Sequence, residues 1–212
     1  MSVRSVRVMT ARHPRFELGY RDGMTGNRDG AVVGSLPVIG NQGRLRDVTL
    51  ADADLLDAWS GDPLVFGEFN DCGIEREPTN RDALAKGPYR NERNGQLIVE
   101  RLDTGAPVGT VGWHRAHYGP GERSDAWNIG ISLIPEARGF GLGSEAQRLV
   151  ADYLFATTDL DRVEASTDVD NVAEQRALEK GGFIREGILR GAQFRLGTRH
   201  DLVNYARLRT DA

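Results

Sequence analysis

A run of glycines near the middle of the chain has the residue types and spacing of an anion-binding site. Gly139, Gly141 and Gly143 alternate with two apolar residues directly after Arg138. Glycine lets the backbone approach a ligand without a Cβ in the way. The next residues have helical spacing, so the run would lie at a helix N-terminus, where free amide N–H groups and the helix dipole favour an anion. The pattern predicts a phosphate-binding turn with a positive charge beside it.

The elements on either side would hold this turn in place. Four of the six residues at 129–134 are Ile or Leu, which predicts a largely buried strand, and Pro135 ends it because proline cannot donate to a ladder. After the turn, apolar residues recur at i, i+3 and i+4 spacings and give a helix with one apolar face. They are Leu142, Ala146, Leu149, Val150, Tyr153 and Leu154.

Two familiar phosphate motifs do not fit this turn. A P-loop has Lys and then Ser or Thr after its last glycine, but Ser144 and Glu145 follow Gly143. The dinucleotide fingerprint requires Gly-x-Gly-x-x-Gly, whereas these glycines lie two apart. The turn therefore points to neither kind of site.

The composition is that of an ordinary globular protein. The chain has 212 residues, 39% hydrophobic and 27% charged, which is enough for one domain plus an extension. Its net charge of −4 gives no general attraction to nucleic acid or an anionic membrane, and no apolar run approaches the about 20 residues of a membrane span. The single cysteine, Cys72, fits a reducing compartment. We therefore expect a cytoplasmic protein that binds neither nucleic acid nor membrane.

Residues 1–43 have no sustained periodicity, and we interpret them as an N-terminal extension that is flexible or draped on the domain. Residues 31–39 could form one strand. An alternative is an arm that contributes to an acceptor site or to a homodimer contact. The folded domain is expected over residues 44–212.

Within residues 44–212 the predicted order is strand, two helices, three strands, helix, strand, helix and two strands. The ranges are 45–48, 51–60, from 79 onward, 96–101, 107–113, 127–134, 142–155, 163–167, 172–180, 183–189 and 201–207. Residues 114–125 are expected to form a polar loop, and Arg190, Arg195 and Arg199 to lie in a solvated one. This order predicts an α/β fold with a mixed sheet that is mostly antiparallel in its first half.

Three stretches resemble the GNAT superfamily of acyl-CoA N-acyltransferases. Arg138, Gly141 and Gly143 occupy the fixed positions of its pyrophosphate signature, Arg/Gln-x-x-Gly-x-Gly/Ala. Residues 171–183 are similar to the Asn-x-x-Ser-x-Arg-x-Leu-Glu-Lys-x-Gly-Phe block of the RimJ/RimL-like branch, and residues 45–63 resemble the opening block of that branch. The resemblance covers about residues 44–209. It implies the GNAT fold, in which the mixed sheet is splayed between its central strands and flanked by helices.

The resemblance also implies acetyl-CoA as co-substrate and no metal. The pantetheine arm would lie between the strands at 127–134 and 162–167, and the backbone N–H near Ile131 would polarise the thioester carbonyl. The pyrophosphate would lie on the amides of residues 139–144. The expected cofactor contacts are Ile131, Ser132, Leu133, Ile134, Arg138, Gly139, Phe140, Gly141, Leu142, Gly143, Ser144, Asn171 and Arg176.

Direct attack by an amine requires an acceptor for the amine proton and a proton donor for the leaving thiolate. Many GNAT enzymes have a glutamate base where this chain has Asn128, and an amide cannot serve as that base. His114 and His117 are the nearest titratable substitutes, although both could equally be exposed loop histidines. Glu174 replaces the serine of the branch and is either the thiolate's acid or, as we favour, the capping-box partner of Asn171.

These features favour an N-acetyltransferase acting on the α-amine of a peptide or protein. An α-amine has a pKa of about 7.7–8.0, against about 10.4 for a lysine side chain, so it needs only a modest base. Two alternatives stay open. One is an enzyme for a small-molecule amine, such as an antibiotic or metabolite. The other is a non-catalytic acyl-CoA-binding module, because the expected Glu and Ser are both missing.

Overall fold

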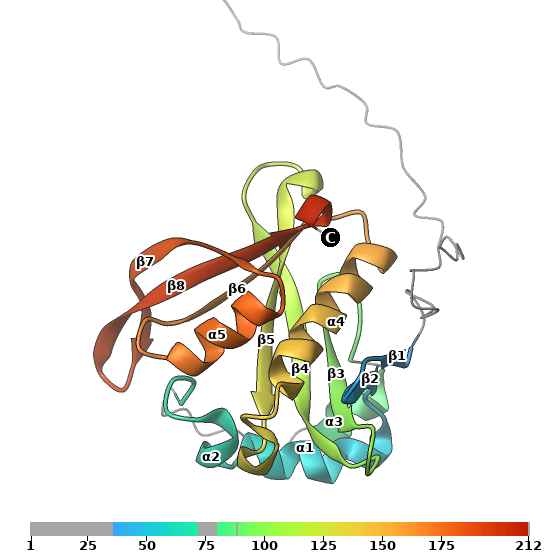
Figure 1. The fold of residues 1–212 in the computed structure, drawn as a ribbon. Helices are drawn as coiled ribbons and strands as arrows, with labels where there is room; N and C mark the ends of the chain where they lie inside the picture. The colour runs from blue at the N-terminus through green and yellow to red at the C-terminus, as the bar shows by residue number, and fades with distance from the viewer. Residues whose placement is uncertain (1–35, 72–79, 88, 212) are drawn as a thin grey trace, which may run out of the picture.

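Eight strands form a single mixed sheet in a computed structural model that describes residues 36–71, 80–87 and 89–211 (Figure 1). The strands lie in the order β1-β2-β3-β4-β5-β6-β8-β7, and every neighbouring pair is antiparallel except β5 and β6. Their bounds are β1 Val38–Ile39, β2 Gly43–Asp47, β3 Asn94–Arg101, β4 Pro107–His117, β5 Asp125–Leu133, β6 Arg162–Asp168, β7 Ile184–Arg195 and β8 Thr198–Leu208. The mixed, mostly antiparallel sheet predicted from the sequence is confirmed.

Helices cover both faces of this sheet. The α-helices are α1 Ala53–Ser60, α2 Pro63–Phe66, α3 Asn80–Lys86, α4 Leu142–Thr157 and α5 Val172–Lys180, and the 3₁₀ turns are η1 Leu50–Asp52, η2 Glu122–Ser124, η3 Pro135–Ala137 and η4 Arg209–Asp211. Side chains of a strand alternate between faces, and β3 shows the division. Leu97 and Val99 pack in the core that includes α4, whereas Ile98 packs with Leu56 of α1 on the other face.

The apolar face predicted for the helix after the glycine turn is confirmed, because all six of its residues are buried in α4. Together with Trp127 and Ile129 of β5 and Val163 of β6, they form the main core. This burial is what holds the start of α4 against the end of β5. In Figure 1, α4 and α5 lie on the same side of the strands.

The sheet begins before Arg44, where we predicted that the folded domain starts. Val38 of β1 is buried and pairs with Leu45 of β2. The turn between these strands lies so close to α4 that a Cβ on Gly43 would be 2.4 Å from Leu142. The rest of the predicted extension, and Cys72, lie outside the described residues.

Two predicted loops are strands in the structure. The polar loop expected at 114–125 is shorter, because β4 continues to His117, which pairs with Asp125 of β5. The guanidinium of Arg115 lies 5.4 Å from the ring centre of Trp127 in β5. This contact lets a polar residue of the predicted loop pack against the neighbouring strand. The loop expected to carry Arg190, Arg195 and Arg199 is the β7–β8 hairpin.

Arg195 is buried, contrary to the expectation that it is solvated. Its guanidinium donates to the carboxylate of Asp168 at 2.7 Å and to the carbonyl oxygen of Phe69 at 2.8 Å. Burial alone would raise the pKa of Asp168, but hydrogen bonds from the Asp170 backbone and from Arg195 hold that pKa below its usual value. The ion pair therefore ties the β7–β8 hairpin to the end of β6, and the hydrogen bond to Phe69 ties it to the segment after α2.

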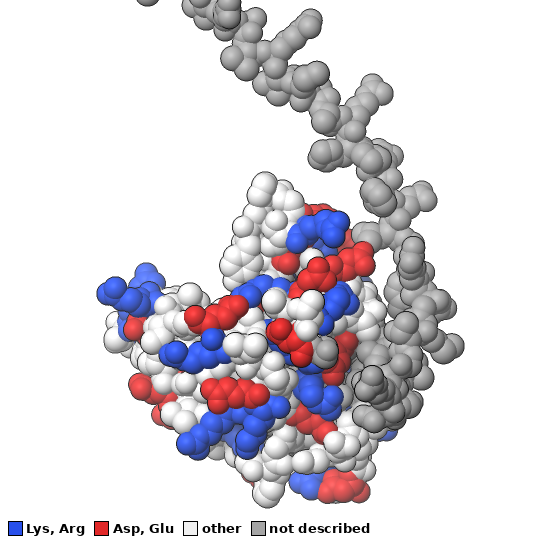
Figure 2. Space-filling view, turned by 45° about the horizontal axis from the view of Figure 1, so that its top comes forward, with Lys and Arg blue, Asp and Glu red and all other residues white. Residues whose placement is uncertain are grey.

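Acidic and basic side chains are interspersed on the face shown in Figure 2, without an extended area of one sign. Among the described helices, none is long and apolar enough to cross a membrane.

Candidate active site

The two central strands separate after two residue pairs. Trp127 pairs with Val163, and Asn128 pairs with Glu164, in the only parallel pairing of the described sheet. Beyond them, residues 129–133 of β5 pair with β4 alone, while β6 continues to pair with β8. The edge of β5 that faces β6 is therefore left without a strand partner in the described part of the chain. The splay predicted between these strands is confirmed.

The glycine turn lies at the end of this exposed edge and leads into α4. Gly139 has a φ of +85° and Gly141 a φ of +88°, a backbone region that residues with a Cβ rarely adopt. Gly141 is the residue just before α4, so the first N–H groups of that helix open onto the turn. Gly143 has no such constraint, because a Cβ there would make an ordinary contact of 3.6 Å with Leu133.

Arg138 braces the turn with the side chain that we expected to supply a free charge. Its Nε donates to the carbonyl oxygen of Leu133 at 2.9 Å, and its Nη2 donates to Leu64 at 2.6 Å and to Val65 at 2.9 Å. The positive charge remains next to the turn. Most N–H groups of its guanidinium, however, donate to backbone carbonyl oxygens and so join the end of β5 to α2.

The predicted cofactor contacts on β5 divide between the two faces of the sheet. Ile131 points toward α4, since its Cδ1 is 4.0 Å from the Cβ position of Gly143, and Leu133 is buried on the same face. Ser132 points the other way and donates to the carbonyl oxygen of Val65 in α2 at 2.8 Å. Ile134 is partly buried against the core. What residues 131–133 have in common is the backbone edge of β5 that faces β6 and has no strand partner.

A polar cluster lies where the strands separate, on the face opposite α4. The carboxylate of Glu164 is buried and accepts from the Tyr118 hydroxyl at 2.7 and 2.9 Å, from Arg162 Nε at 3.0 Å and from Asn128 Nδ2 at 3.4 Å. Arg162 also binds Glu186 of β7 through two bonds of 2.6 and 2.7 Å. Desolvation and the bond to Glu164 raise the pKa of Tyr118 above its usual value.

The structure does not bring the two predicted histidines together. His114 is exposed and pairs with Asn128, so both lie in one row across the sheet and face the same way. His117 lies three residues further from the splay, about 10 Å along the strand, with its Nδ1 2.8 Å from Asp125. The hydrogen bond with His117 and another from Arg115 lower the pKa of Asp125. Of the two histidines, only His114 pairs across the sheet with Asn128 of the polar cluster.

Asn171 caps α5, but the predicted capping box is only half formed. The side-chain oxygen of Asn171 accepts from the backbone N–H of Glu174 at 3.3 Å, and its side-chain nitrogen donates to Thr167 at 3.0 Å. The reciprocal bond from Glu174 is absent, because the Asn171 N–H already donates to the carbonyl oxygen of Asp168 at 3.0 Å. The prediction that Glu174 completes the box is therefore wrong.

Glu174 instead turns its carboxyl group into the space between α5 and α4. Burial raises its pKa to about 7, and Gln147 of α4 is the neighbour that opposes this rise. Gln147 is 1% exposed, and its amide atoms make no well-formed hydrogen bond within the described residues. A carboxyl group that is half protonated near neutral pH can give up a proton readily.

Arg176, the remaining predicted contact, is exposed on α5 and pairs with no acidic side chain in the described ranges. Tyr118, Glu164 and Gln147 were missed from the sequence. The alternation of β6 marks Glu164 only as a residue facing away from Val163, and nothing local connects it with Tyr118. No group of His, Cys, Asp and Glu side chains in the described part could hold a metal ion.

Comparisons with known proteins agree with this geometry. Residues 44–184 match the acetyltransferase (GNAT) domain family. The chain is 32% identical over 165 residues to the uncharacterized N-acetyltransferase YoaA of Bacillus subtilis, which covers 76% of this chain and 90% of that protein.

Solved structures with different acceptors have a similar fold. RimL, a ribosomal L7/L12 α-N-protein acetyltransferase in complex with coenzyme A, matches with a TM-score of 0.66 and 16% identity, over 82% of this chain and 98% of its own. The spermidine N-acetyltransferase of Vibrio cholerae, in complex with CoA and spermine, matches with a TM-score of 0.67 and 19% identity, over 81% of this chain and 98% of its own. At these identities the likeness concerns the fold.

Proposed function

The chain belongs to the GNAT family of acetyltransferases, and we propose that it transfers the acetyl group of acetyl-CoA directly to the α-amine of a peptide or protein. The observation that carries this proposal is the separation of β5 and β6 after Asn128 and Glu164, beside a glycine turn. A gap between strands that ends at a helix N-terminus can take an extended arm and the phosphates attached to it.

In this proposal the arm of acetyl-CoA pairs with the free edge of β5 at residues 131–133. The pyrophosphate lies on the amides of residues 139–144, in the turn braced by Arg138. The thioester carbonyl then lies near the backbone N–H of Ile131, where a hydrogen-bond donor stabilises the oxyanion that forms on attack.

The acceptor amine approaches from the face that carries Asn128 and Glu164. Its neutral nitrogen attacks the thioester carbon, the carbon–sulfur bond breaks, and CoA leaves as a thiolate. His114, which lies in the same row as Asn128, takes the proton from the amine. Glu164 is already bound by Tyr118, Arg162 and Asn128, so we assign it to shaping this face.

Glu174 supplies a proton to the thiolate. Its pKa of about 7 keeps part of the population protonated at neutral pH, and it lies in the first turn of α5, close to Asn171. This role replaces the capping role that we favoured from the sequence.

The charges near the splay support an acceptor with one positive charge rather than a polyamine. Within the described residues, the two carboxylates of the polar cluster, Glu164 and Glu186, are both bound to Arg162, so they leave little uncompensated negative charge for a polycation. An α-amine is partly neutral at physiological pH, which suits the exposed histidine as base.

A thiol-detecting assay with acetyl-CoA tests the proposal. We expect thiol release to accelerate with peptides that have a free α-amine, and to lose that acceleration when the same peptides are N-terminally blocked. If spermidine accelerates thiol release and no peptide does, the acceptor is a small-molecule amine and the proposed peptide substrate is wrong. Absence of acceleration by any amine, with acetyl-CoA still bound, would overturn acetyl transfer.

A further inference from the structure

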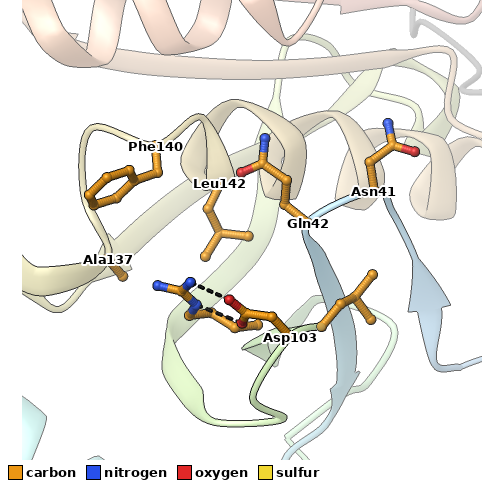
Figure 3. A pocket seen from close by; sticks show the side chains of 8 residues that line it. Asn41, Gln42, Asp103, Ala137, Phe140 and Leu142 are labelled. Atoms are coloured by element: carbon orange, nitrogen blue, oxygen red, sulfur yellow. Dashed lines mark hydrogen bonds and ion pairs between the residues drawn. The ribbon is translucent and has the colours of Figure 1, made fainter.

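A cavity of about 560 Å³ lies between α3 and the start of β3, and we call it the α3 pocket. It is larger than the cavity of about 240 Å³ beside the glycine turn, where Phe140 and Gln42 lie on either side of Leu142 (Figure 3). The function proposed above leaves the α3 pocket without a role. The residues that line it include Asn80, Lys86, Tyr89, Asn91, Asn94 and Gln96.

The α3 pocket lies on the same face of the sheet as the proposed acceptor site. Ile98 of β3 packs against α1 and α3 on the face opposite α4. Asn94 and Gln96 are an even number of residues from Ile98, so their side chains point to that face as well. Asn94 pairs with His114, and His114 pairs with Asn128. One row across the sheet therefore leads from the proposed base to the pocket.

Two glycines leave the way from the free edge of β5 to this pocket without side chains. Gln96 pairs with Gly112 of β4, and Gly112 pairs with Gly130 of β5. Apart from its neighbours in the chain, no described atom lies within 4 Å of the position that a Cβ on Gly130 would take. β3 and β5 each lie about 4.8 Å from β4, so about 10 Å separates β5 from the pocket, a distance that about three extended residues span.

The free polar groups of the pocket suit a negatively charged ligand. Among the described residues that line it, Lys86 is the one with a charged side chain, and it is exposed. Lys86 forms no ion pair with a described residue, and the side-chain amide of Gln96 forms no hydrogen bond with one. An ammonium group and an amide N–H can both donate to a carboxylate, and such charge-assisted bonds are stronger than neutral ones.

The other side-chain amides of the pocket are already engaged. Asn80 Nδ2 donates to Asp57 Oδ1 at 2.5 Å, and Asn80 Oδ1 accepts from the Tyr89 hydroxyl at 2.6 Å. Asn91 Nδ2 donates to Asn94 Oδ1 at 2.8 Å. The carboxylate of Asp57 is thereby held on Asn80 and lies outside the lining. These bonds fix the walls and leave the ammonium group to select the ligand.

We propose that the α3 pocket binds an acidic side chain at the second or third residue of the acceptor peptide, with Lys86 and Gln96 donating to its carboxylate. This inference rests on the proposed function, because the peptide reaches the pocket from an α-amine placed beside His114 and Asn128. It gives the acceptor class as peptides or proteins with Asp or Glu close behind a free N-terminus. A polyamine would instead bring a second positive charge next to Lys86.

Peptides that differ at one residue test this assignment. One set has Asp, Asn or Lys at the second residue and another has them at the third, with a free α-amine throughout. In at least one set we expect kcat/KM for the Asp peptide to exceed that for the Asn peptide by about 10-fold, mainly through KM, and the Lys peptide to be the poorest. Lys86→Glu should reverse this order. Lys180→Glu makes the same change in the last turn of another helix, α5, and should keep it.

Binding of the N-acetylated Asp peptide in the presence of CoA, measured by calorimetry, adds a readout that needs no turnover. We expect Lys86→Glu to weaken it by a similar factor and Lys180→Glu to leave it unchanged. Equal kcat/KM for all peptides of both sets would overturn the acidic preference while acetyl transfer to peptides stands. A preference for Asp that persists in Lys86→Glu would also overturn it, because the carboxylate would then bind elsewhere. If no peptide accelerates thiol release, the proposed function itself fails, and this inference fails with it.

Discussion

The carboxylate of Glu145, in the first turn of α4, accepts a hydrogen bond of 2.9 Å from the backbone N–H of Gly43 at the start of β2. The same carboxylate accepts from the N–H groups of Asn41 and Gln42 at 2.5 and 2.9 Å. One acidic side chain thus satisfies three amides of the β1–β2 turn and fixes that turn to the helix that follows the glycine turn.

Glu145→Ala should therefore lower both stability and donor affinity. Three amides would lose their partner, and a bond to a charged acceptor contributes about 1.5–3 kcal/mol where it is shielded, less where it is exposed as here. We expect a loss of about 2 kcal/mol in the free energy of unfolding, measured by urea denaturation, and weaker acetyl-CoA binding by calorimetry. Glu136→Ala, in the exposed turn η3, is the control. Unchanged stability would contradict this role.

Gly141→Val should abolish measurable acetyl-CoA binding. Gly141 has a φ of +88° at the start of α4, and a β-branched side chain would both strain that backbone and occupy the approach to the amides. Gly105→Val carries a comparable strain at a φ of +68° in the β3–β4 turn, with open space around it, and separates strain from ligand exclusion. Calorimetry that finds wild-type affinity in a folded Gly141→Val would refute the phosphate site.

Glu174→Gln should change the pH dependence of stability in a definite direction. The folded-state pKa of about 7 lies above the usual 4.5, so the folded protein loses stability as pH rises from about 4.5 to 7 and ionisation becomes unfavourable. Glutamine removes this loss. We expect the variant to be more stable than wild type at pH 8, by at most about 3 kcal/mol, and equally stable at pH 4.

Urea denaturation at both pH values measures this difference, with Glu122→Gln in the exposed turn η2 as control. The same variant tests the proposed acid, because kcat should fall by about 10²-fold while stability does not fall. A variant that keeps the wild-type kcat would show that the thiolate takes its proton from another source.

The two histidines should behave differently in a pH–rate profile. His114→Ala should lower kcat/KM by about 10²-fold or more and remove the acidic limb, since general-base assistance is worth about 10²–10⁴-fold. His117→Ala should keep the profile, because its side chain binds Asp125 at the far end of β4. If His114→Ala keeps the wild-type rate and limb, the proton leaves through water or through another group.

Much of the fold was predictable because its signals are local. The apolar face of α4 follows from the spacing of apolar residues within the helix, and the turn before it follows from glycines two residues apart. The same holds for Asn171 as a helix cap, since the cap and the N–H that it accepts are three residues apart.

The chemistry at the splay was decided by the tertiary structure. Tyr118 meets Glu164 across 46 residues of sequence, and Arg195 meets Asp168 across 27. Glu174 lies against α4 rather than over its own helix end, and the burial that results raises its pKa to about 7. Such contacts are determined by the register between strands and by the packing between helices. Both the register and the packing depend on how the whole core buries its apolar side chains. A sequence pattern predicts which residues of a strand point to the same face, but it does not predict which side chains of other elements will contact them.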